Sequence, residues 1–310
     1  MDINDSYITD SGISGTPRSS SSDPPTSMSV AIHVFRLRRL WACIHTTLYS
    51  DTTLSSPAHP TYHTRTEHLR MELENWRASI PPLSPHVGEA LSLFASADWF
   101  EVNYSYSILL LYRGQLTESK GGVADNIFLE CLQAAENICH GYRRQFIGRS
   151  VGYTWGALHF LFLAGLTYLH CLWTSPAARG VVRQDDVSST CTDCTMVLVV
   201  MAERWEGAAP YRDIFEALAS RTMTMMVDKN HEKWMLPSGS RQSDGLDPGD
   251  LTRWMADIAD TGMSDGIDRF LTGLIGDLPS KDQGTCPEGR GTTIRPGSSS
   301  RRVLEYVREQ

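Results

Sequence analysis

A stretch without charge in the middle of the chain constrains the fold most. From Ser150 to Ala178 there is no Asp, Glu, Lys or Arg, and the central part reads WGALHFLFLAGLTYLHCLW. About 20 apolar residues cross a hydrocarbon core of roughly 30 Å, so length alone allows a membrane span. Two histidines lie inside the stretch, arginines flank both ends, and no second such stretch occurs. These features favour a helix buried at the centre of a helical domain, with no membrane involved.

Apolar residues recur at helical spacing along most of the chain. Val30, Val34, Leu37, Trp41, Ile44 and Leu48 follow one another at intervals of three and four, which places them on one stripe of a helix. The same pattern predicts helices over 28–49, 69–80, about 88–116, 128–146, about 151–174, 194–205 and 210–218. No alternating run of β-branched residues predicts a strand. The expected fold is all-α, an irregular multi-helix domain with one central, fully apolar helix at about 151–174.

Composition divides the chain into four parts. Residues 1–27 combine an acidic start with a Ser/Gly/Pro-rich linker, a composition that cannot offset the entropy of ordering. The helical patterns fill 28–226, where we expect one all-α regulatory domain. Residues 227–275 predict a polar loop with short C-terminal helices, one of them near Leu251 to Ile258. Residues 276–310 are again rich in Ser, Gly, Thr and Pro and predict a disordered tail.

Charge and cysteine content limit the class of protein. Acidic residues outnumber basic ones by 36 to 28, giving a net charge of −8, so the chain as a whole does not attract nucleic-acid phosphates. Seven cysteines lie mostly in apolar runs, which is typical of reduced thiols rather than a disulfide scaffold. The start MDINDSYITD lacks the basic and apolar regions of a signal peptide.

Several residue groups could carry chemistry, but each favours a structural role. Cys191 and Cys194 have the spacing of zinc ligands, but no second pair lies nearby, and packing is the better interpretation. His159 and His170 share a helical stripe roughly 16 Å apart, too far to share a metal ion. The pair Asp185-Asp186 is followed by VSST, so the D-D-x-x-D pattern of magnesium-diphosphate enzymes is missing. No catalytic motif occurs, and we expect neither an enzyme nor a cofactor.

Three arginines stand out on the first predicted helix. Arg36, Arg38 and Arg39 place local positive charge there. They could contact phosphate, but a solvated face opposite the apolar stripe is the favoured interpretation.

Seven phrases together resemble the fungal-specific transcription factor domain, or middle homology region, of fungal zinc-cluster (Zn2Cys6) transcription factors. They are INDSYI, SMSVAIHVFRLRRLWACIHTTLY, LRMELENWRASIP, YSYSILLLYRGQL, CLQAAENICHGYRR, WGALHFLFLAGLTYLHCLW and VLVVMAERWEGAAPYRDIFEAL, in one order from about Asp2 to Thr224. The resemblance implies a nuclear, all-α domain that acts by protein interaction or effector sensing.

The family's N-terminal DNA-binding module is not visible in this sequence. That module holds two zinc ions with six cysteines. No C-x-x-C-x6-C run lies near the start of this sequence, and its first cysteine is Cys43. Either the module lies in a missing upstream exon or this is a relative without it. In both cases we expect this polypeptide alone to reach DNA only indirectly. The expected partners are proteins of the transcription machinery or a DNA-binding protein, and a homo- or heterodimer is compatible with the first helix.

The last phrase predicts a helix–helix elbow. Gly207 is expected to end one helix and Pro210 to begin the next, with Glu203, Arg204, Trp205, Tyr211, Arg212 and Asp213 around the corner. We expect Arg204 to pair with Asp213 or Glu216 and so to fix the angle. The aromatic residues expected to matter for structure are Trp155, Trp173, Trp205 and Tyr211.

Two other functions stay open. Aromatic-lined helical cores can hold a small apolar metabolite, which makes a small-molecule-binding module the alternative to a regulatory domain. An all-α enzyme would need carboxylates that converge in a cleft, and the sequence offers no such cluster.

Overall fold

The computed structural model describes residues 2–3, 5–19, 23–49, 61–82, 96–117, 123–146 and 154–232. Within these ranges the fold is all-α, as predicted, apart from one hairpin of two-residue strands. The elements are η1 (Asp5–Tyr7), β1 (Ile8–Thr9), β2 (Gly12–Ile13), α1 (Ser29–Leu48), α2 (Tyr62–Ala78), α3 (Ala97–Thr117), α4 (Asp125–Phe146), α5 (Trp155–Thr174), α6 (Pro176–Val181), α7 (Gln184–Arg204), η2 (Glu206–Ala208) and α8 (Ala209–Glu232).

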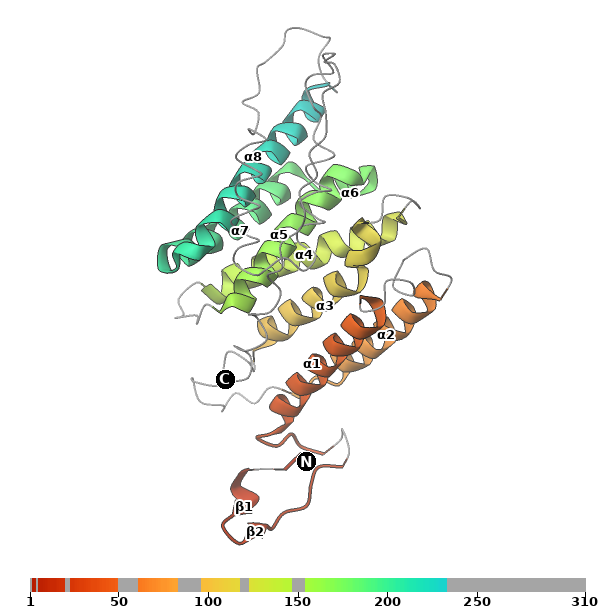
Figure 1. The fold of residues 1–310 in the computed structure, drawn as a ribbon, viewed down its shortest axis with the longest axis vertical. Helices are drawn as coiled ribbons and strands as arrows, with labels where there is room; N and C mark the ends of the chain where they lie inside the picture. Colours follow the sequence, from red (N-terminus) through yellow and green to blue (C-terminus); the bar gives the residue numbers. More distant parts are fainter. Residues whose placement is uncertain are drawn as a thin grey trace, which may run out of the picture.

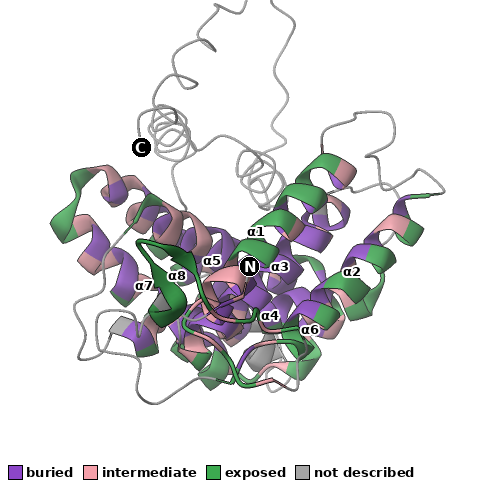
Figure 2. Ribbon diagram, turned by 90° about the horizontal axis from the view of Figure 1, so that it is seen from below, coloured by how far each residue is buried: buried purple, intermediate pink, exposed green. Residues whose placement is uncertain are grey.

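The helices form a layered stack (Figure 1). The pair α1 and α2 lies at one end and packs on α3, and the pair α7 and α8 lies at the other end. Between them, α4 packs against α3, α5, α6 and α7, while α5 packs against α3, α4, α6, α7 and α8. The predicted central helix α5 therefore shares the centre with α4. The interior of the stack is buried and its outer helix faces are exposed (Figure 2).

The long apolar helix α5 is covered by its neighbours. By length and composition it is the one helix in the described ranges that could cross a membrane, but 72% of its apolar window is buried inside the protein. Every residue from Leu161 to Leu172 is buried. The hydroxyl of Thr154 accepts a hydrogen bond from the Ala157 backbone and caps the first turn. This burial supports the prediction of a core helix.

The first predicted stripe also lies where expected. Leu37, Trp41, Ile44 and Leu48 are buried, and Val30 and Val34 pack at the edge of the core. The pair Pro81-Pro82 follows soon after α2 ends at Ala78, in agreement with the predicted stop.

Several details differ from the sequence-based predictions. α6 was not predicted, because a six-residue helix is too short to show apolar periodicity; the Ser175 hydroxyl caps it and Pro176 occupies its first turn. α7 begins at Gln184, well before the predicted Cys194, and it ends at Arg204 instead of Gly207. The cause at that end is Trp205, whose extended backbone (φ −146°, ψ 109°) breaks the helix.

The predicted domain limits are only partly covered by the structure. The hairpin β1–β2 lies inside the predicted linker 1–27, where Ile8 pairs with Ile13. α8 continues to Glu232, past the predicted limit at 226. The predicted start of the third helix near Gly88, the short helix near Leu251 and the tail 276–310 lie outside the described residues.

Candidate functional site

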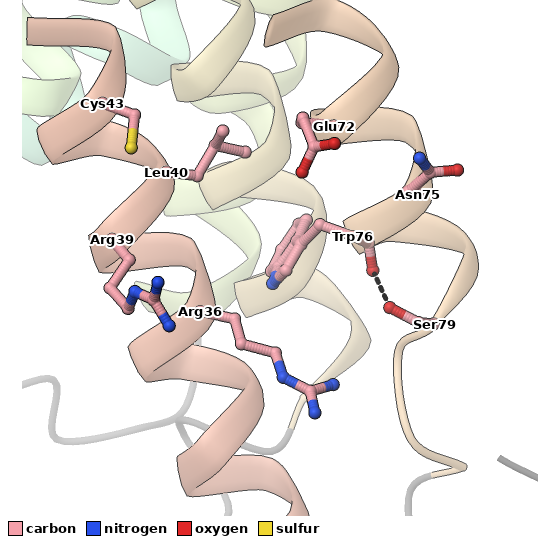
Figure 3. Close-up of a pocket in the computed structure, with 8 residues that line it drawn as sticks. All are labelled: Arg36, Arg39, Leu40, Cys43, Glu72, Asn75, Trp76 and Ser79. Atoms are coloured by element: carbon pink, nitrogen blue, oxygen red, sulfur yellow. Dashed lines mark hydrogen bonds between the residues drawn. The ribbon is translucent and has the colours of Figure 1, made fainter. Parts of the chain in front are cut away.

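A groove between α1 and α2 is the candidate site on the described surface. It has a volume of about 320 Å³ and is lined by Arg36, Arg39, Leu40, Cys43, Glu72, Asn75, Trp76 and Ser79. Figure 3 shows the arginines projecting from α1 and the acidic and amide side chains from α2, with the Trp76 indole between the helices. One wall is therefore basic, the other carries a carboxylate, and the floor is aromatic.

The aromatic floor is fixed from below by a buried histidine. The Trp76 ring stacks on the His33 ring at 4.8 Å, and its indole nitrogen donates a hydrogen bond to the His33 backbone oxygen at 3.0 Å. Phe100 contacts the same His33 ring edge-on. Burial and the nearby Arg36 guanidinium lower the pKa of His33 to about 4, so the ring is neutral at pH 7. Neither ring nitrogen of His33 has a hydrogen-bond partner among the described residues.

Among the polar groups of the groove, the Ser79 hydroxyl donates a hydrogen bond to the Trp76 backbone oxygen at 3.0 Å, whereas the two arginines are left to solvent. Arg36 and Arg39 are exposed, and neither forms an ion pair with a carboxylate of the described residues. Cys43 is the exposed thiol among the cysteines that the structure describes. Arg38 differs from its neighbours because its guanidinium lies over the Trp41 ring, 4.3 Å from the centroid. The prediction of exposed arginines is thus confirmed, and two of them face a groove.

The predicted elbow brings its aromatic residues together. The rings of Trp155 and Trp205 meet edge-to-face at 5.0 Å, and Trp155 also contacts Tyr211 at 6.4 Å. Tyr211 is fully buried, whereas the two tryptophans are about 40% exposed (40% and 42%). A Cβ atom on Gly207 would lie 2.8 Å from the Trp205 ring, so glycine allows the indole to pack over the turn. Trp173 lies elsewhere, donating a hydrogen bond to the Thr222 hydroxyl at 2.7 Å.

The ion pair that the structure shows at the elbow joins two residues adjacent in the sequence. The Arg212 guanidinium contacts the carboxylate of its neighbour Asp213 at 2.6 Å. The expected pairing of Arg204 with Asp213 or Glu216 stays a prediction, and so does a structural role for Glu203.

The Cys191–Cys194 pair is buried in the core. Burial raises the pKa of Cys191 to about 12 and that of Cys194 well above the ordinary thiol value. A metal ligand must be a thiolate, and burial disfavours that form. Within the described ranges no three His, Cys, Asp or Glu side chains converge as a metal site would require.

The two histidines of α5 have separate environments. A ring nitrogen of His170 lies 3.1 Å from the Leu116 backbone oxygen, in the core. Burial, with the charges of Arg113 and His45, lowers the pKa of His159 to about 4. Both observations agree with a structural role for the two histidines in the packing of α5.

A polar cluster between α4 and α7 resembles a catalytic triad in geometry only. His140 Nδ1 lies 2.7 Å from the Asp193 carboxylate, and His140 Nε2 lies 3.4 Å from the Thr190 hydroxyl. That hydroxyl donates to the Asp186 backbone oxygen at 2.9 Å, and Thr190 is 1% exposed. Since a nucleophile must reach its substrate, the cluster is best explained as a polar link between two helices. Sequence reasoning missed it because its members lie on different helices.

The acidic pair in the first turn of α7 has a local structural explanation. The Asp186 carboxylate accepts a hydrogen bond from the Arg183 backbone nitrogen at 3.2 Å and closes the start of the helix. Asp185 lies in solvent beside Arg183. Neither carboxylate lines the α1–α2 groove.

Comparisons with known proteins point to transcription. A positive regulator of purine utilization from Emericella nidulans is 25% identical over 267 residues, covering 73% of this chain and 24% of the relative. Pyrimidine pathway regulatory protein 1 from Saccharomyces cerevisiae is 27% identical over 155 residues, covering 47% of this chain and 16% of the relative. An uncharacterized transcriptional regulatory protein of the same yeast is 28% identical over 178 residues, covering 51% and 12%.

The chain is therefore similar to fungal transcriptional regulators, which are not named as enzymes. It aligns with a quarter or less of the length of each of these relatives. No protein-family profile and no solved structure matches it.

Proposed function

We propose that this chain forms a transcription-regulatory domain of the middle-homology type and acts in the nucleus through protein interactions. The observation that carries the proposal is the alignment of 73% of the chain with a fungal regulator. The all-α stack supports it, because the seven phrases that resemble the middle homology region fall mostly on its helices.

In this proposal, contact with a DNA sequence comes from another module or from a DNA-binding partner. The described helices contain no group of His, Cys, Asp or Glu side chains that could bind zinc and so order a DNA-binding helix. The net charge of −8 also disfavours binding to DNA through the whole surface.

A small-molecule-binding module is the second candidate. The α1–α2 groove of about 320 Å³ lies at the lower end of the usual range for ligand pockets, roughly 300–1,000 Å³. Thermal shift measurements across a panel of metabolites would test this candidate, and a uniform lack of stabilisation would count against it.

A tethering experiment tests the regulatory role. The chain is fused to a heterologous DNA-binding domain, and a reporter gene carrying the cognate site is measured in a fungal host. We expect a change in reporter output relative to the DNA-binding domain alone, together with nuclear accumulation of a fluorescent fusion that carries no added localisation signal. An abundant, folded fusion that leaves the reporter unchanged would contradict the proposal.

A further inference from the structure

The exposed side of α1 combines positive charge with an exposed aromatic ring. α1 contains three arginines and no Asp or Glu. Many other described arginines contact carboxylates, namely Arg18, Arg70, Arg77, Arg143, Arg144, Arg183 and Arg212. Arg36 and Arg39 have no such partner in the described residues, so their guanidinium groups keep five N–H donors each for another molecule.

Phe35 extends this feature beyond the groove. Its side chain is 67% exposed, more than any other large apolar side chain of the described helices except Val181. Phe35 and Arg39 are four residues apart, so they lie on the same face of α1. The groove then continues inward from Arg39 to Leu40 and the Trp76 indole. Positively charged and apolar side chains therefore alternate across this surface.

We propose that this basic-aromatic surface, formed by Phe35, Arg36, Arg39, Leu40 and Trp76, binds an acidic peptide segment of a partner protein that carries a bulky apolar residue. The two arginines bind the peptide carboxylates, and the apolar residue contacts Phe35 or the Trp76 floor. Arginine and aromatic side chains supply much of the binding energy in protein interfaces. This inference rests on the proposed regulatory function and names its contact surface.

The charges around the groove favour a peptide over nucleic acid. Glu72 stands on the α2 wall of the same groove, across from Leu40 and Cys43 (Figure 3), where it would repel a chain of phosphates. A peptide avoids this repulsion because it can place a backbone N–H or a neutral side chain at that wall. Asn75, which lines the same wall, can hydrogen-bond to a peptide backbone.

The extent of the surface favours a peptide over a small free acid. A small carboxylic acid could occupy the groove beside Arg36, but it would leave Phe35 in water. A segment of several residues covers both, and burying an exposed aromatic side chain contributes to association.

Fluorescence polarisation tests the proposal with a labelled synthetic peptide that combines Asp, Glu, Leu and Phe. A matched peptide replaces every Asp with Asn and every Glu with Gln. We expect the acidic peptide to bind and the neutral one to bind at least about tenfold more weakly. Arg36→Glu and Arg39→Glu should each weaken binding at least about fivefold, because an attraction becomes a repulsion. Arg183→Glu, the same change at an exposed arginine of the α7 end, should leave binding unchanged.

The exposed thiol of Cys43 provides an independent measurement of location. Five other cysteines of the described residues are buried, and Cys286 lies outside these residues, so a Cys286→Ser chain should react mainly at Cys43. Bound peptide should slow alkylation of Cys43 by iodoacetamide severalfold. Circular dichroism verifies that each variant retains its helices.

Three results would overturn the proposal. They are equal binding of the neutral peptide, unchanged binding by both arginine variants, and unprotected Cys43 at saturation. Binding of a duplex DNA probe that is lost in the same variants would assign the surface to nucleic acid instead. If the tethered chain regulates the reporter but the peptide does not bind, the surface is wrong and the regulatory function stands.

Discussion

The Trp76 indole is held to His33 by two contacts at once, a ring stack at 4.8 Å and a hydrogen bond from its nitrogen to the His33 backbone oxygen at 3.0 Å. These contacts join α2 to α1 beneath the groove. The tryptophan that forms the groove floor is therefore kept in place by a histidine that solvent does not reach.

This arrangement predicts a stability that depends on pH. The pKa of His33 is about 4 in the folded chain against 6.5 in an ordinary histidine. The unfolded chain therefore binds more protons between these values, so the free energy of unfolding falls as the pH drops from 6.5 toward 4. His33 should account for roughly 2–3 kcal/mol of that loss.

His33→Phe tests the pH prediction. Phenylalanine can keep the stack on Trp76 and cannot take up a proton, so chemical denaturation should show a smaller loss between pH 6.5 and 4. Some loss should persist, because the pKa of His159 is lowered to about 4 as well. His63→Gln, at an exposed position of α2, serves as control. An unchanged pH slope in His33→Phe would rule out this role.

Removing the hydroxyl of Ser107 should destabilise the chain. The buried Trp41 indole nitrogen donates a hydrogen bond to Ser107 Oγ at 2.7 Å. In Ser107→Ala the indole loses its acceptor, which should lower the free energy of unfolding by about 1–3 kcal/mol. Thr46→Ala removes an exposed hydroxyl of α1 and should have little effect. Equal stabilities of the two variants in urea denaturation would contradict the prediction.

A methyl group at Gly165 should disrupt the packing of α5 against α7 and α8. A Cβ atom there would lie 2.6 Å from the Phe215 ring and 2.9 Å from the Cys194 sulfur. Gly165→Ala should therefore cost about 1–3 kcal/mol. Gly156→Ala is the matched control on the same helix, because its nearest neighbour would be the Thr154 hydroxyl at 3.8 Å. Thermal unfolding should show a lower midpoint for Gly165→Ala alone. Similar midpoints for the two variants would mean that Phe215 and Cys194 move aside for the added methyl group, which would contradict the prediction.

The elbow prediction concerns Arg204. If its guanidinium pairs with the half-buried Asp213 or with the exposed Glu216, Arg204→Ala should lower the melting temperature, and the loss should be larger for Asp213 because its carboxylate is partly shielded from water. Arg221→Ala, in α8, controls for the loss of one positive charge. An unchanged melting temperature in Arg204→Ala would exclude the pairing, and Arg212 would then be the arginine that holds Asp213.

The candidate groove could be foreseen only in part. Arg36 and Arg39 were visible in the sequence as a local positive charge, and their exposure follows from the stripe of Leu37, Trp41 and Ile44. The sequence could not show that these arginines share a groove with Trp76 and Glu72, because that depends on how α1 and α2 cross. The same reason hid the cluster of His140, Thr190 and Asp193.

The sequence alone determined most of the long helices and which side of them is buried, because apolar periodicity is a local property of each turn. Thus α1 begins within one residue of its predicted start, and the charge-free stretch became the buried helix α5. The short α6 and the start of α7 at Gln184 were not visible in the sequence. Only the tertiary structure decided which side chains from distant helices meet, such as Trp76 on His33 and Trp155 on Trp205. Those meetings depend on the crossing of packed helices, where side-chain shape over the whole interface selects one arrangement among several of similar hydrophobic burial.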